Sequence, residues 1–151
     1  MPKNHPKLIA PHAMAISIMT KKEDFDAASQ YADVAMQISK LAWNDMHSDS
    51  SSLYSNIGMM YSAMGDYDAA ISNYERAIDI QKQILLADTD DMAYLYDCLG
   101  ALYIKLGDFD NAYLNYVKSG EIYVKLRNWT EDQFESYKEY LITYIEERLG
   151  K

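Results

Sequence analysis

The sequence predicts an all-α fold made of repeated helical hairpins, and three observations support this fold class. A short pattern recurs at residues 23–28, 65–70 and 107–112, a period of 42 residues. In each copy an acidic residue stands on each side of an aromatic one, and the copy ends with an alanine. Apolar residues after each copy follow the i, i+3, i+4, i+7 spacing of an amphipathic helix. The 151-residue chain also holds only 6 Gly and 3 Pro, too few for a turn-rich β-sandwich.

The first repeat, about residues 8–46, is the least regular of the three. We expect one helix from about Lys7 to Lys21 and a second from about Phe25 to Met46, followed by a turn at residues 48–50. Ile16 stands where the later repeats carry glycine, and the aromatic residue of the second helix is missing too. We therefore interpret this repeat as a degenerate one that caps an end of the array.

The second repeat, about residues 51–87, predicts helices from about Ser51 to Met64 and from Tyr67 to Ala87. Gly65 is placed to end the first of these helices, because glycine readily adopts the left-handed conformation of a helix C-terminus. Asp66 follows as the expected N-cap of the next helix, where its carboxylate can accept a backbone hydrogen bond.

The third repeat, about residues 91–128, predicts helices from about Asp91 to Leu106 and from Phe109 to Arg127. A last helix is expected over residues 130–149, because the Thr-Glu-Asp-Gln sequence at its start has the spacing of a capping box. Its place after the third hairpin predicts that it closes the other end of the stack.

Two glycines lie in the middle of predicted helices, where glycine costs about 1 kcal/mol relative to alanine. We expect a close crossing of the two helices of each hairpin to compensate for this cost. The small residues of the partner helices predict the facing pairs Gly58 with Ala70 and Gly100 with Ala112.

The residues that recur between the second and third repeats are mainly glycine, alanine and tyrosine. They read Tyr54-x2-Ile57-Gly58-x2-Tyr61 then Ala70-x3-Tyr74-x2-Ala77, and Tyr96-x2-Leu99-Gly100-x2-Tyr103 then Ala112-x3-Tyr116. This spacing resembles the tetratricopeptide repeat, over roughly residues 8–128. The usual period of that family is about 34 residues. The longer period here is similar to the long-helix variety of kinesin light chains and of some bacterial peptide-sensing regulators.

The resemblance implies a right-handed α-solenoid of three hairpins plus a C-terminal capping helix, seven helices in all, as a single domain over residues 1–151. It also implies that the first helix of each hairpin lines a concave groove. The residues expected to project into this groove and contact a partner are Ser52, Ser55, Asn56, Met59, Tyr94, Asp97, Cys98, Lys105, Glu139 and Tyr140.

We expect the groove to bind an extended protein or peptide segment without catalysing a reaction. The Asn56 amide can donate and accept hydrogen bonds with a peptide backbone, while Asp97 and Glu139 favour a neutral or basic partner. In the alternative, Asn56 contacts a neighbouring helix and the partner binds the convex side. The clamp that holds chaperone tails in some tetratricopeptide domains is not implied, because Tyr94 and Cys98 occupy its basic positions.

Two other functions remain open from the sequence. The chain can form homo-oligomers if the first or last helix exposes apolar area. It can also be the sensor domain of a larger peptide-responsive regulator.

Composition and charge argue against several other classes of protein. The formal net charge of -9 disfavours binding to nucleic acid. The 3 His residues are far apart and Cys98 has no nearby histidine in its repeat, so we expect no catalytic site, metal or cofactor. A single cysteine suits a cytoplasmic protein. The apolar run at residues 8–19 is too short for a membrane helix; a signal peptide is the alternative to a first helix of the fold.

Overall fold

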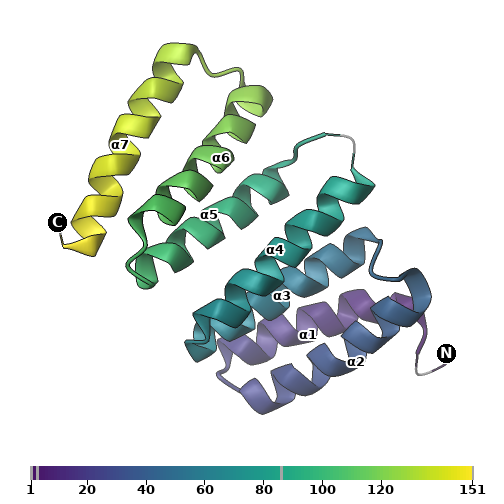
Figure 1. Cartoon of the computed structure of the whole chain (residues 1–151). Helices are drawn as coiled ribbons and strands as arrows, with labels where there is room; N and C mark the ends of the chain where they lie inside the picture. Colours follow the sequence, from purple (N-terminus) through teal and green to yellow (C-terminus); the bar gives the residue numbers. More distant parts are fainter. Residues whose placement is uncertain (1, 3, 86, 151) are drawn as a thin grey trace. The chain divides into compact units, whose positions relative to one another are not determined.

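The computed structural model describes residues 2, 4–85 and 87–150, and these residues form helices and connecting turns without a β-strand. Figure 1 shows the helices in chain order. They are a 3₁₀ helix η1 (Pro6–Leu8) and the α-helices α1 (Ile9–Lys21), α2 (Phe25–Trp43), α3 (Ser48–Met64), α4 (Tyr67–Ile84), α5 (Asp90–Lys105), α6 (Phe109–Arg127) and α7 (Glu131–Leu149). The all-α repeat fold that the sequence predicts is confirmed.

Contacts between residues divide the chain into two compact units, Met1–Leu86 and Ala87–Lys151. In the first unit α1 packs on both α2 and α3, and α3 packs on α4. In the second unit α6 packs on both α5 and α7. The helices therefore pair as the repeats predict, and the single domain expected over residues 1–151 stays a prediction.

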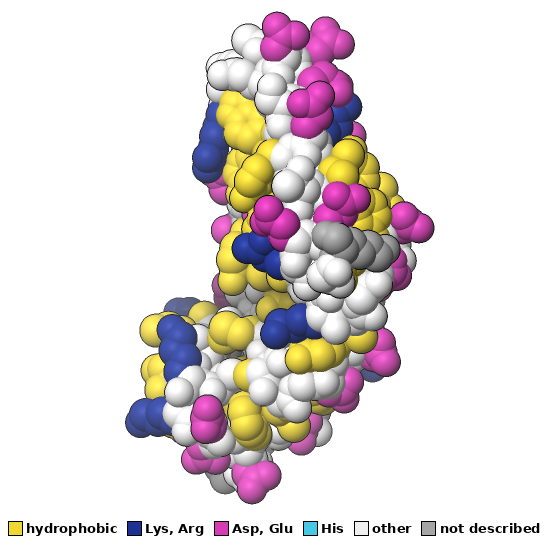
Figure 2. Space-filling view, turned by 90° about the vertical axis from the view of Figure 1, so that its left-hand side faces the viewer, with side chains coloured by type: hydrophobic (Ala, Val, Ile, Leu, Met, Phe, Trp, Pro, Cys, Tyr) yellow, Lys and Arg dark blue, Asp and Glu magenta, His cyan; other side chains and the backbone are white. Residues whose placement is uncertain are grey.

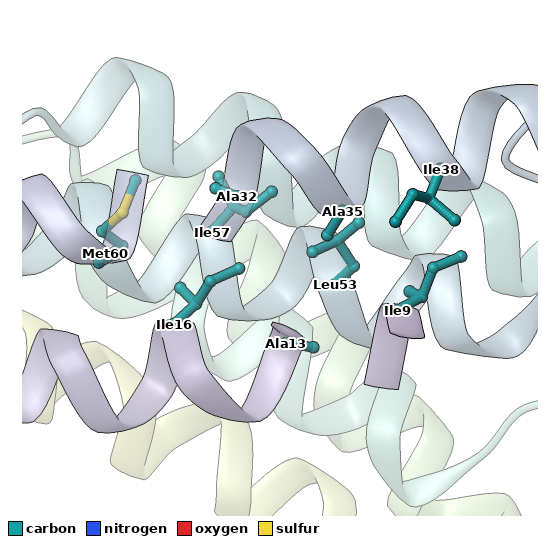
Figure 3. Packing of buried hydrophobic residues seen from close by; sticks show 10 residues of the cluster. Ile9, Ala13, Ile16, Ala32, Ala35, Ile38, Leu53, Ile57 and Met60 are labelled. Atoms are coloured by element: carbon teal, nitrogen blue, oxygen red, sulfur yellow. The ribbon is translucent and has the colours of Figure 1, made fainter. Parts of the chain in front are cut away.

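The core of the first unit consists of apolar side chains from its first three helices. Figure 3 shows Ile9, Ala13 and Ile16 of α1 together with Ala32, Ala35 and Ile38 of α2 and Leu53, Ile57 and Met60 of α3, all of them buried. Burial of such side chains stabilises a fold by about 1.5–3 kcal/mol for each large one. This core holds the degenerate first repeat against the second repeat.

At two positions that correspond between the first and second repeats, the large and the small residue have changed places. Where the second repeat has Gly58 on α3 and Tyr74 on α4, the first has Ile16 on α1 and Ala32 on α2. Ile16 is 0% exposed and Ala32 is 2% exposed, and both belong to one core cluster. A large residue has replaced glycine on one helix and a small one has replaced tyrosine on the other, so the interior stays close-packed.

Tyrosine rings fill the space beside the mid-helix glycines of the second and third repeats. A Cβ atom placed on Gly58 would lie 3.0 Å from the ring of Tyr74, and one placed on Gly100 would lie 2.7 Å from the ring of Tyr116. Both distances are shorter than ordinary van der Waals contact. A side chain at either position would have to displace the partner ring, and the closer contact at Gly100 makes this the more costly of the two.

The predicted facing pairs Gly58 with Ala70 and Gly100 with Ala112 stay predictions. The alanines are fully buried, and the atoms nearest to a Cβ placed on each glycine belong to the tyrosine four residues further along the partner helix. Both residues lie on the same helix face, so helical periodicity alone does not distinguish them.

The turns inside the hairpins have the predicted chemistry. The carboxylates of Asp66 and Asp108 accept hydrogen bonds from the backbone N–H three residues further on, at 3.1 and 3.0 Å. Gly65 and Gly107 have φ angles of 83° and 76°, in the left-handed region. In the first repeat Glu23 takes a φ of 59° at the corresponding position.

The end of α2 differs from the prediction. This helix ends at Trp43 instead of near Met46, because Asn44 and Asp45 adopt left-handed φ angles of 49° and 66°. Asparagine and aspartate tolerate this conformation better than other non-glycine residues. The chain therefore turns three residues earlier than the apolar pattern suggests.

Two further boundaries need correction. The turn expected at residues 48–50 is the first turn of α3, and the Nδ1 atom of His47 caps it by accepting a hydrogen bond from a backbone N–H at 3.1 Å. The second helix of repeat two ends at Ile84 instead of Ala87. Leu86, which the prediction placed inside that helix, lies outside the described residues.

A buried carboxylate connects three helices of the first unit. Asp45 is 6% exposed, and it accepts hydrogen bonds from Ser39 Oγ at 2.7 Å and from the Tyr54 hydroxyl at 3.1 Å. The Arg76 guanidinium lies 3.4 Å from the same carboxylate. Ser50 shares a hydrogen bond of 2.5 Å with Ser39. The turn after α2 is therefore joined to α2, α3 and α4 by polar contacts.

The capping box predicted at the start of α7 is present, and its loss is expected to destabilise the second unit. Thr130 Oγ accepts from the Gln133 N–H at 3.3 Å, and Gln133 Oε1 accepts from the Thr130 N–H at 2.8 Å. We expect Thr130→Ala to lower the free energy of unfolding by about 1 kcal/mol, measured by urea denaturation. Thr143→Ala, in an exposed position of the same helix, is the control; equal losses in both variants would contradict the role of the cap.

Candidate functional site

The helix α7 carries two kinds of residue on different faces. Leu141 and Ile145 are buried and belong to the core of the second unit. Another face presents Tyr140, Tyr144 and Arg148, each four residues from the next. Residues at this spacing lie above one another on a helix, so they form a continuous stripe.

One open depression lies beside the C-terminal half of this stripe, and we call it the α5–α7 depression. Its volume is about 510 Å³, within the range of small-ligand sites. The residues that line it are Ala101, Ile104 and Lys105 of α5, Tyr116 of α6, and Tyr144 and Arg148 of α7. It combines two cationic side chains with an aromatic and aliphatic wall.

The two tyrosines of this depression hold each other and the arginine in place. The guanidinium carbon of Arg148 lies 3.4 Å from the centre of the Tyr144 ring, and its Nη1 atom donates to the Tyr144 carbonyl at 3.2 Å. The Tyr116 and Tyr144 rings pack edge to face with centres 5.8 Å apart. Burial and the neighbouring Tyr144 raise the pKa of Tyr116, so its hydroxyl stays neutral at physiological pH.

A second open depression, which we call the aromatic depression, lies beside the N-terminal half of α7. Its volume is about 410 Å³. It is lined by Trp129 from the α6–α7 turn and by Gln133, Ser136, Tyr137 and Tyr140 of α7. The rings of Trp129 and Tyr137 pack edge to face with centres 5.5 Å apart.

The aromatic depression is fixed to α6, and a ring contact links its lining to that of the α5–α7 depression. A Cβ atom on Gly120 of α6 would lie 2.5 Å from the Tyr137 ring, so this glycine lets the ring approach. The Tyr137 hydroxyl donates to the Tyr116 carbonyl at 3.3 Å. Tyr140 and Tyr144 have ring centres 5.7 Å apart, one ring in each depression. The upper part of Figure 2 shows hydrophobic and acidic side chains side by side on the surface of this unit.

Comparison with known proteins identifies the family. Residues 49–123 match the family model described as tetratricopeptide repeat. The chain is a tetratricopeptide repeat protein. The crystal structure of BtubC (BKLC) from P. vanneervenii superposes with a TM-score of 0.78 at 18% identity, and the match covers 97% of this chain. The chain spans 58% of the length of that protein, and the likeness concerns the fold. No curated protein sequence matches the chain significantly.

The family match covers the second repeat and most of the third, where the sequence pattern is strongest. Tetratricopeptide repeats generally mediate protein–protein interactions and are typically non-catalytic. The degenerate first repeat lies outside the matched residues. Its exchange of glycine for Ile16 and of tyrosine for Ala32 removes two of the pattern's defining residues.

The predicted partner-binding residues of the first unit all lie on α3 of this tetratricopeptide repeat protein. Ser52 is exposed, whereas Ser55, Asn56 and Met59 are half-buried. The Asn56 Nδ2 atom donates to the Ala13 carbonyl of α1 at 3.0 Å. One donor of the amide is thus used between two helices, as in the alternative that the sequence analysis left open. A role of these residues in partner binding remains a prediction.

The predicted residues of the second unit are divided between the depressions and other places. Lys105 lines the α5–α7 depression and Tyr140 lines the aromatic depression. Tyr94 is exposed, and a hydrogen bond with the Cys98 side chain raises its pKa to about 12. Glu139 is exposed on α7.

Several residues of the depressions were not among the predicted partner-binding residues. These are Ile104, Tyr116, Trp129, Gln133, Tyr137, Tyr144 and Arg148. The spacing of four residues from Tyr140 to Arg148 was the available signal, since it marks one face of α7. It was missed because Tyr144 was assigned, with Leu141 and Ile145, to the face of α7 that packs on the core.

Within the described part of the chain, no three His, Cys, Asp or Glu side chains are placed to hold a metal ion together. None of the described helices combines the length and the apolar character needed to cross a bilayer.

Asp97 gives the second unit a pH dependence that can be tested. Burial raises the pKa of its carboxyl, and the nearby Ser119 and Tyr123 hydroxyls only partly offset this. The folded state therefore binds a proton more readily than the unfolded state, whose carboxyl titrates near about pH 3.9. Stability then falls as pH rises from that value through the folded pKa.

We expect Asp97→Asn to raise the urea midpoint at pH 7 relative to wild type, and to leave a smaller difference at pH 4. The prediction is contradicted if the stability that Asp97→Asn gains over wild type is smaller at pH 7 than at pH 4.

Proposed function

We propose that this tetratricopeptide repeat protein is a non-catalytic binding module whose second unit holds an extended segment of a protein partner along α7. The observation that carries the proposal is the pair of depressions on one helix face. They are joined by the contact between Tyr140 and Tyr144. Both depressions are large enough to take side chains and are lined by few, well-held polar groups.

The spacing of the depressions matches a short extended peptide. Tyr140 and Arg148 are eight residues apart on α7, which corresponds to about 12 Å along the helix axis. An extended chain covers this distance in about four residues, at roughly 3.3 Å per residue. Side chains of one segment can therefore enter both depressions, and aromatic walls bury apolar area without losing much side-chain freedom.

A selection from a random peptide library, displayed on phage and exposed to the whole chain, tests this proposal. We expect the selected peptides to bind the Tyr140→Ser variant at least tenfold more weakly than wild type. The control is Leu114→Ser, because Leu114 is a similarly exposed apolar residue, 48% accessible on α6, that lines neither depression. Binding that is equal in wild type and Tyr140→Ser would contradict the proposal and direct attention to another face.

One observation favours homo-oligomerisation as a second candidate function. The first two helices expose several large apolar side chains, namely Met14, Ile18, Tyr31, Val34 and Leu41. Leu41 of α2 is the most exposed of these side chains, at 79% accessible. Sedimentation velocity of wild type and Leu41→Lys tests this function. A dimer that dissociates in the variant supports it, and a wild-type monomer at high concentration contradicts it.

A further inference from the structure

Several rings of the second unit have a Lys or Arg side chain over them. Arg127 lies over Tyr123, Arg148 over Tyr144, Lys118 over Tyr96 and Lys138 over Phe134. Among the described residues, no Lys or Arg lies over Trp129, Tyr137 or Tyr140. Tyr140 is 60% exposed, so its face is accessible from solvent. This depression thus offers aromatic faces that no cation of the described chain covers.

Helix α7, which carries most of the lining residues, has six acidic residues and two basic ones. Asp132 and Glu139 immediately precede two lining residues on α7, and both are exposed. Burial, followed by the charge of the Asp97 carboxylate, raises the pKa of Tyr137, so the field of that carboxylate reaches the ring. No lining residue is cationic. From this excess of acidic residues, in a chain of net charge -9, we expect the depression to favour a positive group.

We infer that the aromatic depression binds a basic residue of the partner by cation–π contact with Trp129, Tyr137 and Tyr140. Tryptophan offers the best ring for such a contact, and Gln133 and Ser136 can hydrogen bond to the same group. The inference rests on the proposed function and adds the chemistry of the bound residue. Lys and Arg share this chemistry, and the experiment distinguishes them. A neutral proline-rich segment, which aromatic grooves also bind, is the competing occupant.

Small probes of equal shape and different charge test the role of the cation. We would titrate the whole chain with N-acetyl-trimethyllysine methylamide and with its neutral isostere, in which carbon replaces the ammonium nitrogen. The chain has only 2 Trp, so its two indole N–H signals in an NMR spectrum are resolved by comparison with Trp129→Phe. We expect the charged probe to shift the Trp129 signal and to bind roughly three- to tenfold more tightly than the isostere.

Two further probes and a set of variants complete the experiment. N-acetyl-lysine and N-acetyl-arginine methylamides show which basic side chain binds better, and acetylated triproline amide tests the competing occupant. Tyr140→Ala should weaken binding of the charged probe at least threefold, whereas Tyr140→Phe should retain it because the ring face remains. Tyr94→Ala is the matched control, since Tyr94 is an equally exposed tyrosine, 57% accessible on α5, outside the depression. Circular dichroism checks that each variant is folded.

The outcomes separate this inference from the proposed function. Equal affinity for the charged probe and its isostere overturns the inference, as does binding of triproline without binding of any cation. The proposed function stands in both cases if the selected peptides still depend on Tyr140. If those peptides are insensitive to Tyr140 while the charged probe binds preferentially, the proposed function fails and the cation site remains.

Discussion

Replacing Asp45 by alanine is expected to lower the free energy of unfolding of the first unit by about 2–4 kcal/mol, because hydrogen bonds to charged groups each contribute roughly 1.5–3 kcal/mol. The carboxylate accepts from Ser39 and from Tyr54, and Arg76 lies beside it. Alanine removes the acceptor and leaves the buried Ser39 hydroxyl with one partner fewer. The Arg76 side chain is 40% exposed, so water can hydrate its guanidinium once the carboxylate is gone. The expected loss of stability is therefore smaller than the loss from breaking a fully buried ion pair.

Two other substitutions separate the carboxylate from the backbone conformation. Asp45→Asn keeps a side chain that tolerates the left-handed φ of 66°, but replaces one acceptor oxygen by a donor. We expect Asp45→Asn to lower the free energy of unfolding by less than Asp45→Ala does. Asp33→Ala, at an exposed position of α2, is the control and should change stability by less than about 0.5 kcal/mol.

The measurement should follow the first unit alone, because the chain forms two compact units. In a Trp129→Phe background, the fluorescence of Trp43 reports unfolding next to Asp45. A urea midpoint for Asp45→Ala equal to that of the Asp33→Ala control would show that the polar cluster contributes nothing.

Local chemistry explains why much of the fold could be predicted. A carboxylate that follows a glycine marks the end of one helix and the start of the next without reference to the rest of the chain. Asp66 and Asp108 are therefore at helix starts, as expected. The recurrence of this signal at a fixed period then predicted the pairing of helices into hairpins, which is confirmed.

The features that sequence reasoning missed depend on contacts between distant residues. Helical periodicity places Ala70 and Tyr74 on one face of α4, but it does not say which of them meets Gly58. The end of α2 was misplaced because Asn44 and Asp45 continue an apparently helical segment. The contacts of Asp45 with Tyr54 and Arg76 come from two later helices, and nothing local to the turn announces them.

The candidate site was predictable only in part for the same reason. Lys105 and Tyr140 were identified because they project from helices expected to line a groove. Trp129 is in a turn, and Tyr116 belongs to the repeat pattern that was assigned to the core. Such residues contribute to the depressions because α6 and α7 meet at Gly120, where the absence of a side chain admits the Tyr137 ring.

The substitution Gly100→Leu is expected to destabilise the second unit by about 2–3 kcal/mol, the upper part of the range for overpacked cores. Its Cβ alone would lie 2.7 Å from the ring of Tyr116, which is only 8% exposed and packs edge to face on Tyr144. The ring cannot move away without disturbing that contact. Better helix propensity than glycine recovers at most about 1 kcal/mol.

A second substitution in the partner helix tests the geometry behind this expectation. If the clash with the Tyr116 ring causes the loss, the Gly100→Leu and Tyr116→Ala substitutions together should cost less than the sum of the two single losses, by about 1 kcal/mol or more. Ala101→Leu, at the exposed neighbouring position of α5, is the control for adding a leucine to the same helix turn. Urea denaturation followed by the fluorescence of Trp129, in a Trp43→Phe background, measures all four variants.

Additive losses in the double variant would mean that Gly100 does not make room for the tyrosine ring. A loss in Ala101→Leu as large as that in Gly100→Leu would locate the effect in the helix itself. A coupled loss would also connect the repeat pattern to the site, because the ring that requires Gly100 forms the wall of the α5–α7 depression.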